Sequence, residues 1–383
     1  MTIYLNFITT QPLHFNTHRK FNYQFYEKND INVKIIDLSK CYFAEENLLK
    51  LDEKHQNYNI KLPEKNEISN FSSFDKLTKN KTNNFYFIVN KSIYNEMEGE
   101  KEIFEILNAN NAKYFFQTSL YQGLYQLKNY SYFWLKKSVK LKYKSYFRNL
   151  INPEFVFGSG SSICSDSNVY FRNNVEVLST KSLWIDDTEP SISTSGSFGV
   201  FIEEAVLGSP DTLLLDRKPL LQTQSEHSRY FNYINSIFNQ IEIMSGIKII
   251  ISASGKYFYS EQFGDRAIFY GETLNLIKKA SFVIMHNSIS FLQAVYNLKP
   301  ILLLDYDFNN KYKRNDIYAL EKFLACQRLN FNGDLNKINL NNLLKLSAKS
   351  EIKYKNIIKK YLEEKNDVLP LNKLLFKKLN EEY

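Results

Sequence analysis

The chain has 383 residues, 44% of them hydrophobic, a content that argues against an intrinsically disordered protein. Its formal net charge of +8 favours an anionic partner, whether a phosphorylated substrate, a nucleic acid or an acidic lipid surface. The three cysteines, Cys41, Cys164 and Cys326, lie far apart, which argues against a disulfide framework or a zinc knuckle and fits a reducing cytosol.

Neither end of the chain nor its interior predicts a membrane segment. The stretch "MTIYLNFITTQPLHF" lacks the basic start and long apolar run of a signal peptide, and no apolar run approaches the roughly 18 residues of a spanning helix. The segment 135–148, "LKKSVKLKYKSYFR", mixes lysine with aromatic residues and suits a membrane-surface or polyanion contact. A solvated helix face explains that segment more simply. We therefore expect a cytoplasmic protein that is soluble or at most peripheral.

Short apolar runs recur along the chain and predict strands. In the first half they span 2–8, 33–39, 85–89, 113–117, 155–160 and 175–179, and in the second half 199–204, 247–253, 267–271, 282–286 and 300–305. Many are continuously apolar, which is typical of parallel strands that are covered on both faces. Because helical patterns separate the strands, we predict an α/β fold with doubly wound, Rossmann-like sheets.

The second half has the clearer helical pattern. Apolar residues at helical spacing predict a helix over 225–246. A shorter helix is predicted after Gly271, with Thr273 as its cap, and another from Asn287 onwards. With their strands these helices form a complete nucleotide-binding type of half in about 110 residues.

A serine-rich stretch at 186–199 predicts a boundary between two domains. We expect an N-terminal domain at 1–195 and a C-terminal domain at 196–335. A helical segment at 336–383 is expected to pack back on them.

Small and polar residues cluster where three predicted strands end. They are Ser254 and Lys256 after 247–253, Gly271, Glu272 and Thr273 after 267–271, and His286, Asn287, Ser288 and Ser290 after 282–286. Ligands of open α/β sheets bind beyond the carboxyl ends of the strands, and helix N-termini and hydroxyl groups favour anions. We therefore predict a nucleotide site at these residues. Helix capping is the simpler explanation of any single junction, but three in succession favour the site.

The residues from Ile247 to Leu304, "IKIIISASGKYFYSEQFGDRAIFYGETLNLIKKASFVIMHNSISFLQAVYNLKPILLL", resemble the C-terminal, donor-binding domain of GT-B glycosyltransferases from bacterial capsule and O-antigen gene clusters. The resemblance rests on Gly271, Thr273, His286, Ser288, Ala294 and Lys299-Pro300. The segment 199–211, "GVFIEEAVLGSPD", is similar to the acidic strand end that opens this domain. Where these relatives carry His-Pro after the second strand, this chain has Ser254-Gly255, so no histidine is assigned there.

This resemblance implies a GT-B architecture, in which two Rossmann-like domains face each other across a cleft. It also implies the transfer of a sugar from a UDP- or CMP-activated donor to a growing glycan of a capsule, O-antigen or lipopolysaccharide. The acceptor would be a glycan or a lipid-linked sugar, with peripheral contact at the cytoplasmic face of the inner membrane. Alternatives are a sugar-nucleotide epimerase or pyruvyl transferase on the same fold, and a non-catalytic subunit that binds glycan or nucleotide. Nucleic acid is not expected, because no recognisable module for it occurs.

Acidic residues supply the candidates for catalysis. Glu203 and Glu204 end the predicted strand 199–204, and because neighbours in a strand point to opposite faces, only one of them should meet the substrate as a general base. A solvated or salt-bridged pair explains them equally well. On the acceptor side, His14 and Asp187 are weaker candidates.

We expect no obligatory metal. Helix ends and Lys256 would stabilise the departing phosphate in its place. Asp305 and Asp307 form a D-x-D pattern that suits Mg²⁺ weakly, and the end of a strand explains it more simply.

Overall fold

The computed structural model of the chain describes residues 2–10, 21–42, 63–79, 81, 83–89, 101–118, 153–158, 175–180, 197–207, 223–253, 258–306, 311–330, 339–362 and 369–381. The chain forms two compact units. Met1–Leu183 and Lys359–Tyr383 make the N-terminal unit, and Trp184–Ile358 makes the C-terminal unit. Within the described ranges, no helix combines the length and the apolar character needed to cross a bilayer.

The N-terminal unit contains a seven-stranded parallel sheet with the order β3-β2-β1-β4-β5-β6-β7. Its strands are β1 (Ile3–Thr9), β2 (Ile31–Asp37), β3 (Glu64–Glu67), β4 (Asn84–Ile88), β5 (Lys113–Thr118), β6 (Phe155–Gly158) and β7 (Glu176–Ser179). The order runs outward from β1 in one direction to β3 and in the other to β7, which is the doubly wound arrangement.

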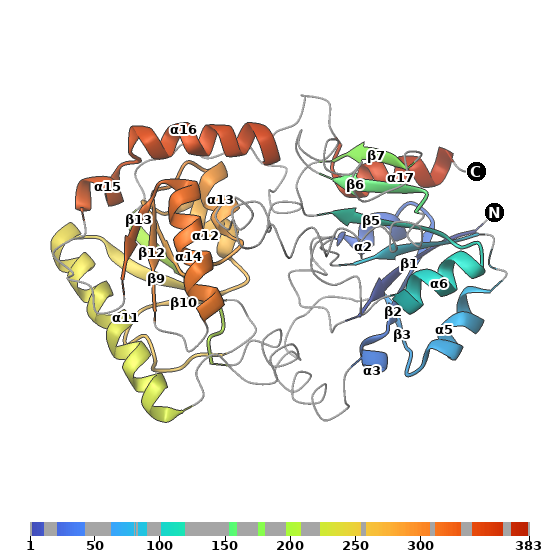
Figure 1. The fold of residues 1–383 in the computed structure, drawn as a ribbon, viewed down its shortest axis with the longest axis horizontal. Helices are drawn as coiled ribbons and strands as arrows, with labels where there is room; N and C mark the ends of the chain where they lie inside the picture. Colours follow the sequence, from blue (N-terminus) through green and yellow to red (C-terminus); the bar gives the residue numbers. More distant parts are fainter. Residues whose placement is uncertain are drawn as a thin grey trace. The chain divides into compact units, whose positions relative to one another are not determined.

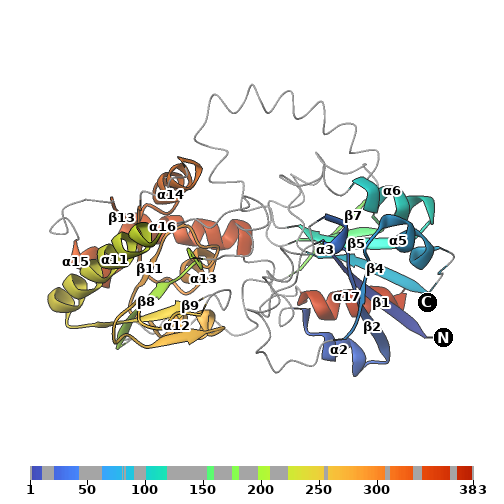
Figure 2. The ribbon, with the colours of Figure 1, turned by 90° about the horizontal axis from the view of Figure 1, so that it is seen from below.

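Helices cover both faces of this sheet. They are α2 (Tyr23–Glu27), α3 (Ser39–Tyr42), α5 (Phe71–Thr78), α6 (Lys101–Ala109) and α17 (Leu371–Glu381). Figure 2 shows α2 and α17 on one side of the sheet and α5 and α6 on the other. Each side has its own apolar core, and the core beneath α2 and α17 is built largely from phenylalanine. The continuously apolar strands therefore lie where their sequence predicts, covered on both faces.

The last helix of the chain belongs to the N-terminal unit. Leu371, Leu375 and Leu379 recur every four residues along one side of α17 and are buried in the core that contains Phe7 and Phe115. Ahead of the helix, the hydroxyl of buried Thr180 donates to the carbonyl of Leu369 at 3.2 Å. The chain thus returns from the C-terminal unit to complete the first sheet's cover.

The C-terminal unit contains a six-stranded parallel sheet with the order β10-β9-β8-β11-β12-β13. Its strands are β8 (Phe198–Ile202), β9 (Lys248–Ala253), β10 (Ile268–Tyr270), β11 (Val283–Met285), β12 (Ile301–Leu304) and β13 (Gln327–Leu329). The order reverses at β8, as it does at β1 in the other unit, so both sheets follow one winding scheme.

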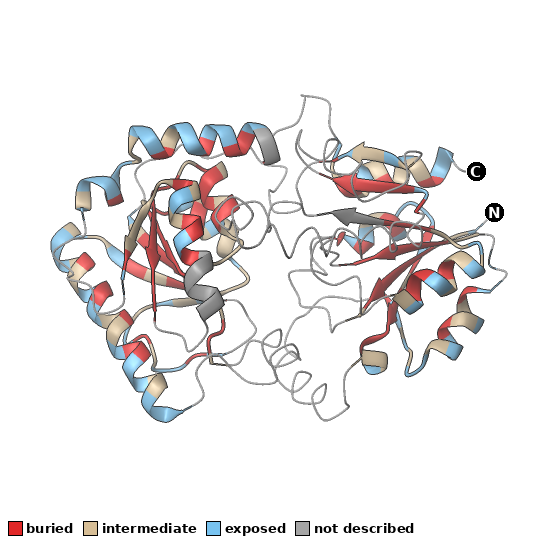
Figure 3. Ribbon diagram, viewed as in Figure 1, coloured by how far each residue is buried: buried red, intermediate tan, exposed pale blue. Residues whose placement is uncertain are grey.

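Helices flank this second sheet as well. They are α11 (Gln224–Ser245), α12 (Thr273–Lys279), α13 (Phe291–Tyr296), α14 (Lys311–Leu324), α15 (Leu340–Leu344) and α16 (Ala348–Ile357). A π-helical turn, η4 (Ile358–Leu362), follows α16, and the N-terminal unit begins again at its second residue. In Figure 1, α11 lies on one side of the strands, and α12, α13 and α14 lie on the other. Figure 3 shows buried residues in the strands and on the inward faces of these helices.

The long helix α11 begins and ends at residues whose chemistry fixes its limits. The Thr223 side chain accepts from the backbone of Glu226, and the Glu226 side chain accepts from the backbone of Thr223, which is a capping box. At the other end Gly246 has a φ of 70°, a left-handed conformation that glycine adopts without strain. The predicted helix over 225–246 is confirmed to within one residue at each end.

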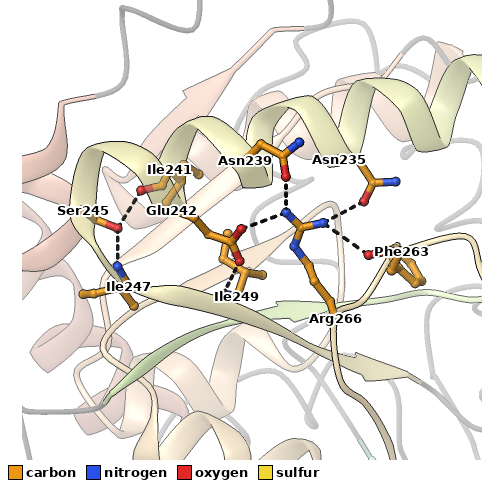
Figure 4. A network of polar contacts seen from close by, with 9 residues as sticks. All are labelled: Asn235, Asn239, Ile241, Glu242, Ser245, Ile247, Ile249, Phe263 and Arg266. Carbon is orange, nitrogen blue, oxygen red and sulfur yellow. Dashed lines mark hydrogen bonds and ion pairs between the residues drawn. The ribbon is translucent and has the colours of Figure 1, made fainter.

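Arg266 ties the C-terminal half of α11 to the loop that precedes β10 (Figure 4). Its guanidinium donates to Glu242 at 2.9 Å, to Asn235 at 3.1 Å and to the carbonyl of Phe263 at 3.2 Å, with a further bond to Asn239. The other Glu242 oxygen accepts from the backbone of Ile249 at 2.8 Å. Because arginine presents several donors in one rigid plane, this single side chain holds the helix, the loop and the start of β9 in register.

Candidate functional site

The candidate site lies at the carboxyl edge of the C-terminal sheet, where the strand order reverses. β8 and β11 pair there in parallel, with Ile202 opposite Met285. Ligands of open α/β sheets bind at such a switch point, beyond the ends of the two strands. The residues that follow β8 and β11 form what we call the switch-point cluster: Glu203, Glu204, His286, Asn287 and Ser288.

Glu203 is buried and accepts hydrogen bonds from the backbone of the turn that follows β8. Its two carboxylate oxygens accept from the backbone of Ala205 at 2.7 Å and of Val206 at 3.0 Å. Ala205 has a φ of 54°, a left-handed conformation that is strained for alanine, so the carboxylate stabilises an unfavourable turn. Burial raises the pKa of Glu203 to about 7, and the Tyr259 hydroxyl and the two N–H groups oppose that rise. These contacts favour a structural role for Glu203, whose role as a base stays a prediction.

Glu204 is half-buried and connects the two strands of the switch point. Its Oε1 accepts from the backbone N–H of Asn287 at 2.6 Å, across a sequence separation of 83 residues. As the alternation of a strand predicts, Glu203 enters the core while Glu204 keeps partial exposure.

His286 is buried and both ring nitrogens bond to protein groups. Nδ1 lies 2.6 Å from the carbonyl oxygen of Leu304, which can only accept, so the network places the proton on Nδ1. Nε2 lies 2.8 Å from the hydroxyl of Tyr230 on α11, which donates to it when the ring is neutral. The ring thus ties the end of β11 to β12 and α11, and its predicted contact with a nucleotide stays a prediction.

The start of α12 lies against the end of β9. The hydroxyl of buried Ser252 donates to the hydroxyl of Thr273 at 2.9 Å. Thr273 is the first residue of the helix and Glu272 occupies the cap position, so the prediction that Thr273 caps the helix is wrong. Gly271 has a φ of 74°, which explains the glycine at the turn into α12. The carboxylate of exposed Glu272 accepts from Asn275 at 2.6 Å.

The start of α13 brings two half-buried serines to the same edge. The Ser288 hydroxyl accepts from the backbone of Ser290 at 3.3 Å, and Ser290 occupies the cap position of α13. α12 contacts α13, β8 and β9. With seven and six residues, both helices are short, so an anion here would depend on individual N–H and hydroxyl groups more than on a helix dipole.

Two features of this edge are absent from the sequence-based prediction. On α13, the Gln293 side-chain oxygen is buried and finds no hydrogen-bond partner among the described residues. Between β9 and β10, the ring of Phe258 packs on Tyr270 with centroids 5.0 Å apart, and Phe258 is 48% exposed. In the sequence, Gln293 could have been noticed as a polar residue within an apolar helical segment. Phe258 and Tyr270 could have been noticed as aromatic residues on either side of a loop at the sheet edge.

Several predicted site residues lie outside the described part of the chain. They are His14, Asp187, Ser254, Lys256 and Asp307. The basic segment 135–148 also lies outside the described residues. Asp305 is described, and its Oδ2 pairs with Arg328 of β13 at 2.9 Å. Mg²⁺ would have to compete with that ion pair, and the described residues include no group of three or more His, Cys, Asp or Glu that could hold a metal.

Neither a protein-family model nor a curated protein sequence matches the chain. Solved structures do match, over almost the full length. The chain is similar to UGT89C1 of Arabidopsis thaliana complexed with quercetin, with a TM-score of 0.53, 9% identity, and coverage of 100% of this chain and 99% of that one. UGT89C1 is also known in complex with UDP. The spinosyn forosaminyltransferase SpnP gives a TM-score of 0.51, 10% identity, and coverage of 99% and 100%. A protein from Listeria monocytogenes described as a UDP-N-acetylglucosamine 2-epimerase gives a TM-score of 0.51 at 10% identity, with coverage of 100% of this chain and 98% of that one.

Two Rossmann-like units with parallel sheets, shared with these structures along the whole chain, define the GT-B fold. The fold class predicted from the sequence is thereby confirmed. At identities of 9–10%, the similarity supports a shared fold and not a shared activity, because one fold hosts many activities.

Proposed function

We propose that the chain is a glycosyltransferase that takes a sugar from a nucleotide-activated donor, and that the donor binds at the carboxyl edge of the C-terminal sheet. The observation that carries this proposal is the switch-point cluster, in which Glu204 and Asn287 join the ends of β8 and β11 where the strand order reverses. The hydroxyls of Ser252, Thr273 and Ser288 lie at the same edge. UDP is the first nucleotide to test, because a structure of the same fold, UGT89C1, binds it.

The chemistry of glycosyl transfer fits the groups gathered here. The leaving phosphate gains negative charge as the sugar departs, so donors that strengthen in the transition state accelerate the reaction. The Ser288 hydroxyl is the donor that we assign to it. The exposed ring of Phe258 offers a stacking surface for a base.

The acceptor and the place of the reaction belong to the same proposal. We assign a growing bacterial surface glycan, free or lipid-linked, as the acceptor, because the stretch from Ile247 to Leu304 resembles donor domains from capsule and O-antigen clusters. Such an acceptor would be met at the cytoplasmic face of the inner membrane. We further propose that no divalent metal is needed, so turnover should persist in EDTA.

A sugar-nucleotide epimerase is the second candidate, because a structure described as such an enzyme has the same fold over the same length. The two activities differ in what they need. A transferase releases nucleotide as it uses up an acceptor, whereas an epimerase converts the donor into its isomer with no acceptor present.

The test is an assay of purified protein with UDP-, CMP-, GDP- and dTDP-sugars, with and without a panel of oligosaccharide acceptors. We expect nucleotide release that increases with an acceptor, and a loss of about tenfold or more in kcat/KM in Ser288→Ala, since a hydrogen bond to a charged group contributes about 1.5–3 kcal/mol. Ser236→Ala, at an exposed position of α11, is the matched control and should keep full activity. Isomerised donor without an acceptor would establish the epimerase, and binding without turnover would leave a non-catalytic subunit.

A further inference from the structure

The bond between Glu204 and Asn287 is more than a contact between neighbours. It joins the second residue after β8 to the backbone of the second residue after β11, and at 2.6 Å it is short for an N–H donor and a carboxylate. Glu204 also acts electrostatically on the core beneath it, since its charge contributes to the raised pKa values of Glu203 and Tyr230. Glu204 therefore interacts with residues at the ends of both β8 and β11.

The backbone held by Glu204 is the one that presents the serines of α13. On one side of Asn287, the ring of His286 is fixed by Leu304 and Tyr230. On the other side, the Ser288 hydroxyl accepts from Ser290 and the helix begins. His286 anchors this segment to β12 and α11, and Glu204 anchors it to β8. Without the bond to Glu204, the segment would lose the hydrogen bond that ties it to the end of β8 next to Ser288.

A general base and a tether make opposite demands on one carboxylate. A base takes up a proton in every turnover, and protonation removes the negative charge that makes the Asn287 N–H bond strong. The bond would weaken just as the leaving phosphate develops its charge at the neighbouring serines. A Glu204 that holds the backbone and takes no part in proton transfer avoids this conflict.

We propose that Glu204 is a positioning residue, which holds the backbone of Asn287 so that Ser288 and the start of α13 face the donor phosphate. This rests on the proposed function, and it moves the role of base away from Glu204. The base then belongs to another group, and on the acceptor side the sequence offers His14.

Two substitutions separate the roles. Glu204→Gln keeps an oxygen that accepts from the Asn287 N–H but cannot serve as a base, whereas Glu204→Ala removes both abilities. Glu261→Ala removes a carboxylate from an exposed loop of the same unit and is the matched control.

The first measurement is hydrogen exchange of the peptide Val283–Phe291 in the protein without ligand. We expect Glu204→Ala to speed exchange there at least tenfold, and Glu204→Gln and Glu261→Ala to stay within about threefold of the wild type, since a surviving acceptor retains most of the protection. Unchanged exchange in Glu204→Ala would overturn the tether. This measurement needs no nucleotide, so its outcome does not depend on the proposed function.

The second measurement is affinity for UDP, CMP, GDP and dTDP, together with the pH profile of kcat/KM for the sugar donor that is used. We expect Glu204→Ala to weaken nucleotide binding about tenfold, and Glu204→Gln to bind and turn over within about threefold of the wild type with the same pH profile. If Glu204→Gln binds nucleotide normally but abolishes turnover and the acid limb of the profile, Glu204 is the base and the proposal is wrong. A wild type that binds none of the four nucleotides would overturn the proposed function and the donor-positioning role with it, while the exchange result would still decide whether the tether exists.

Discussion

Replacing Leu375 with aspartate is expected to lower the free energy of unfolding of the N-terminal unit by about 4 kcal/mol or more. Leu375 is fully buried on α17, in the core that includes Phe7, Phe115 and Phe157. Loss of the leucine side chain from a core costs about 2–5 kcal/mol, and burial of an unpaired carboxylate adds to it. Hydrogen exchange during denaturant titration should show the loss in β1, β4 and β5, while the strands of the C-terminal unit keep their protection.

The matched control is Lys373→Asp, which places the same side chain at an exposed position of the same helix. A surface change of this kind usually alters stability by no more than about 0.5 kcal/mol. Equal stability of the two variants would mean that α17 contributes nothing to the first unit. Loss of protection in both units together would mean that the units unfold as one.

Stability of the C-terminal unit is expected to fall by about 3 kcal/mol as the pH rises from 4.5 to about 7, because of Glu203. Burial raises the pKa of this carboxyl from 4.5 to about 7, so the folded protein holds a proton that the unfolded chain has released within that window. The contribution is fully present below the unfolded pKa and is lost as the pH passes through the folded pKa. Denaturant unfolding at intervals between pH 4.5 and 8 measures it.

Glu203→Gln is the comparison for this effect, because it cannot titrate. The variant should be less stable at every pH, since one of the two backbone N–H groups loses its acceptor. Its stability should nevertheless depend less steeply on pH than that of the wild type between 4.5 and 7. Parallel curves for the two proteins would show that Glu203 does not carry the raised pKa.

The buried part of the fold could be predicted from the sequence because burial leaves a chemical signature. Each of the eleven predicted strands overlaps a strand of the structure. The two missed strands, β3 and β13, lie at sheet edges, where water replaces one neighbour and apolar residues are not required. β3 has the sequence EKNE, and two of its side chains form ion pairs with β2, Lys65 with Asp37 and Glu64 with Lys34. Such cross-strand pairs are invisible until the register is known.

The location of the candidate site could be predicted because it follows from topology, whereas the role of each side chain could not. Strand ends can be identified in a sequence, but the partners of His286, which are Leu304 and Tyr230, lie 18 and 56 residues away. The same holds for Glu204, whose partner is the backbone N–H of Asn287, 83 residues away. A histidine at a strand end therefore looked like a ligand-binding residue, although tertiary contacts place its ring in the core.

The central claim is that a nucleotide binds at the carboxyl edge of the C-terminal sheet, and hydrogen exchange with and without nucleotide tests it most directly. UDP, CMP, GDP and dTDP are first screened by thermal shift, because a ligand of the native state raises apparent stability. With the nucleotide that binds, slower exchange is predicted in Glu203–Leu207, in Tyr270–Leu276 and in Val283–Phe291. Protection confined to the ends of β1 and β4, with these three segments unchanged, would contradict the claim.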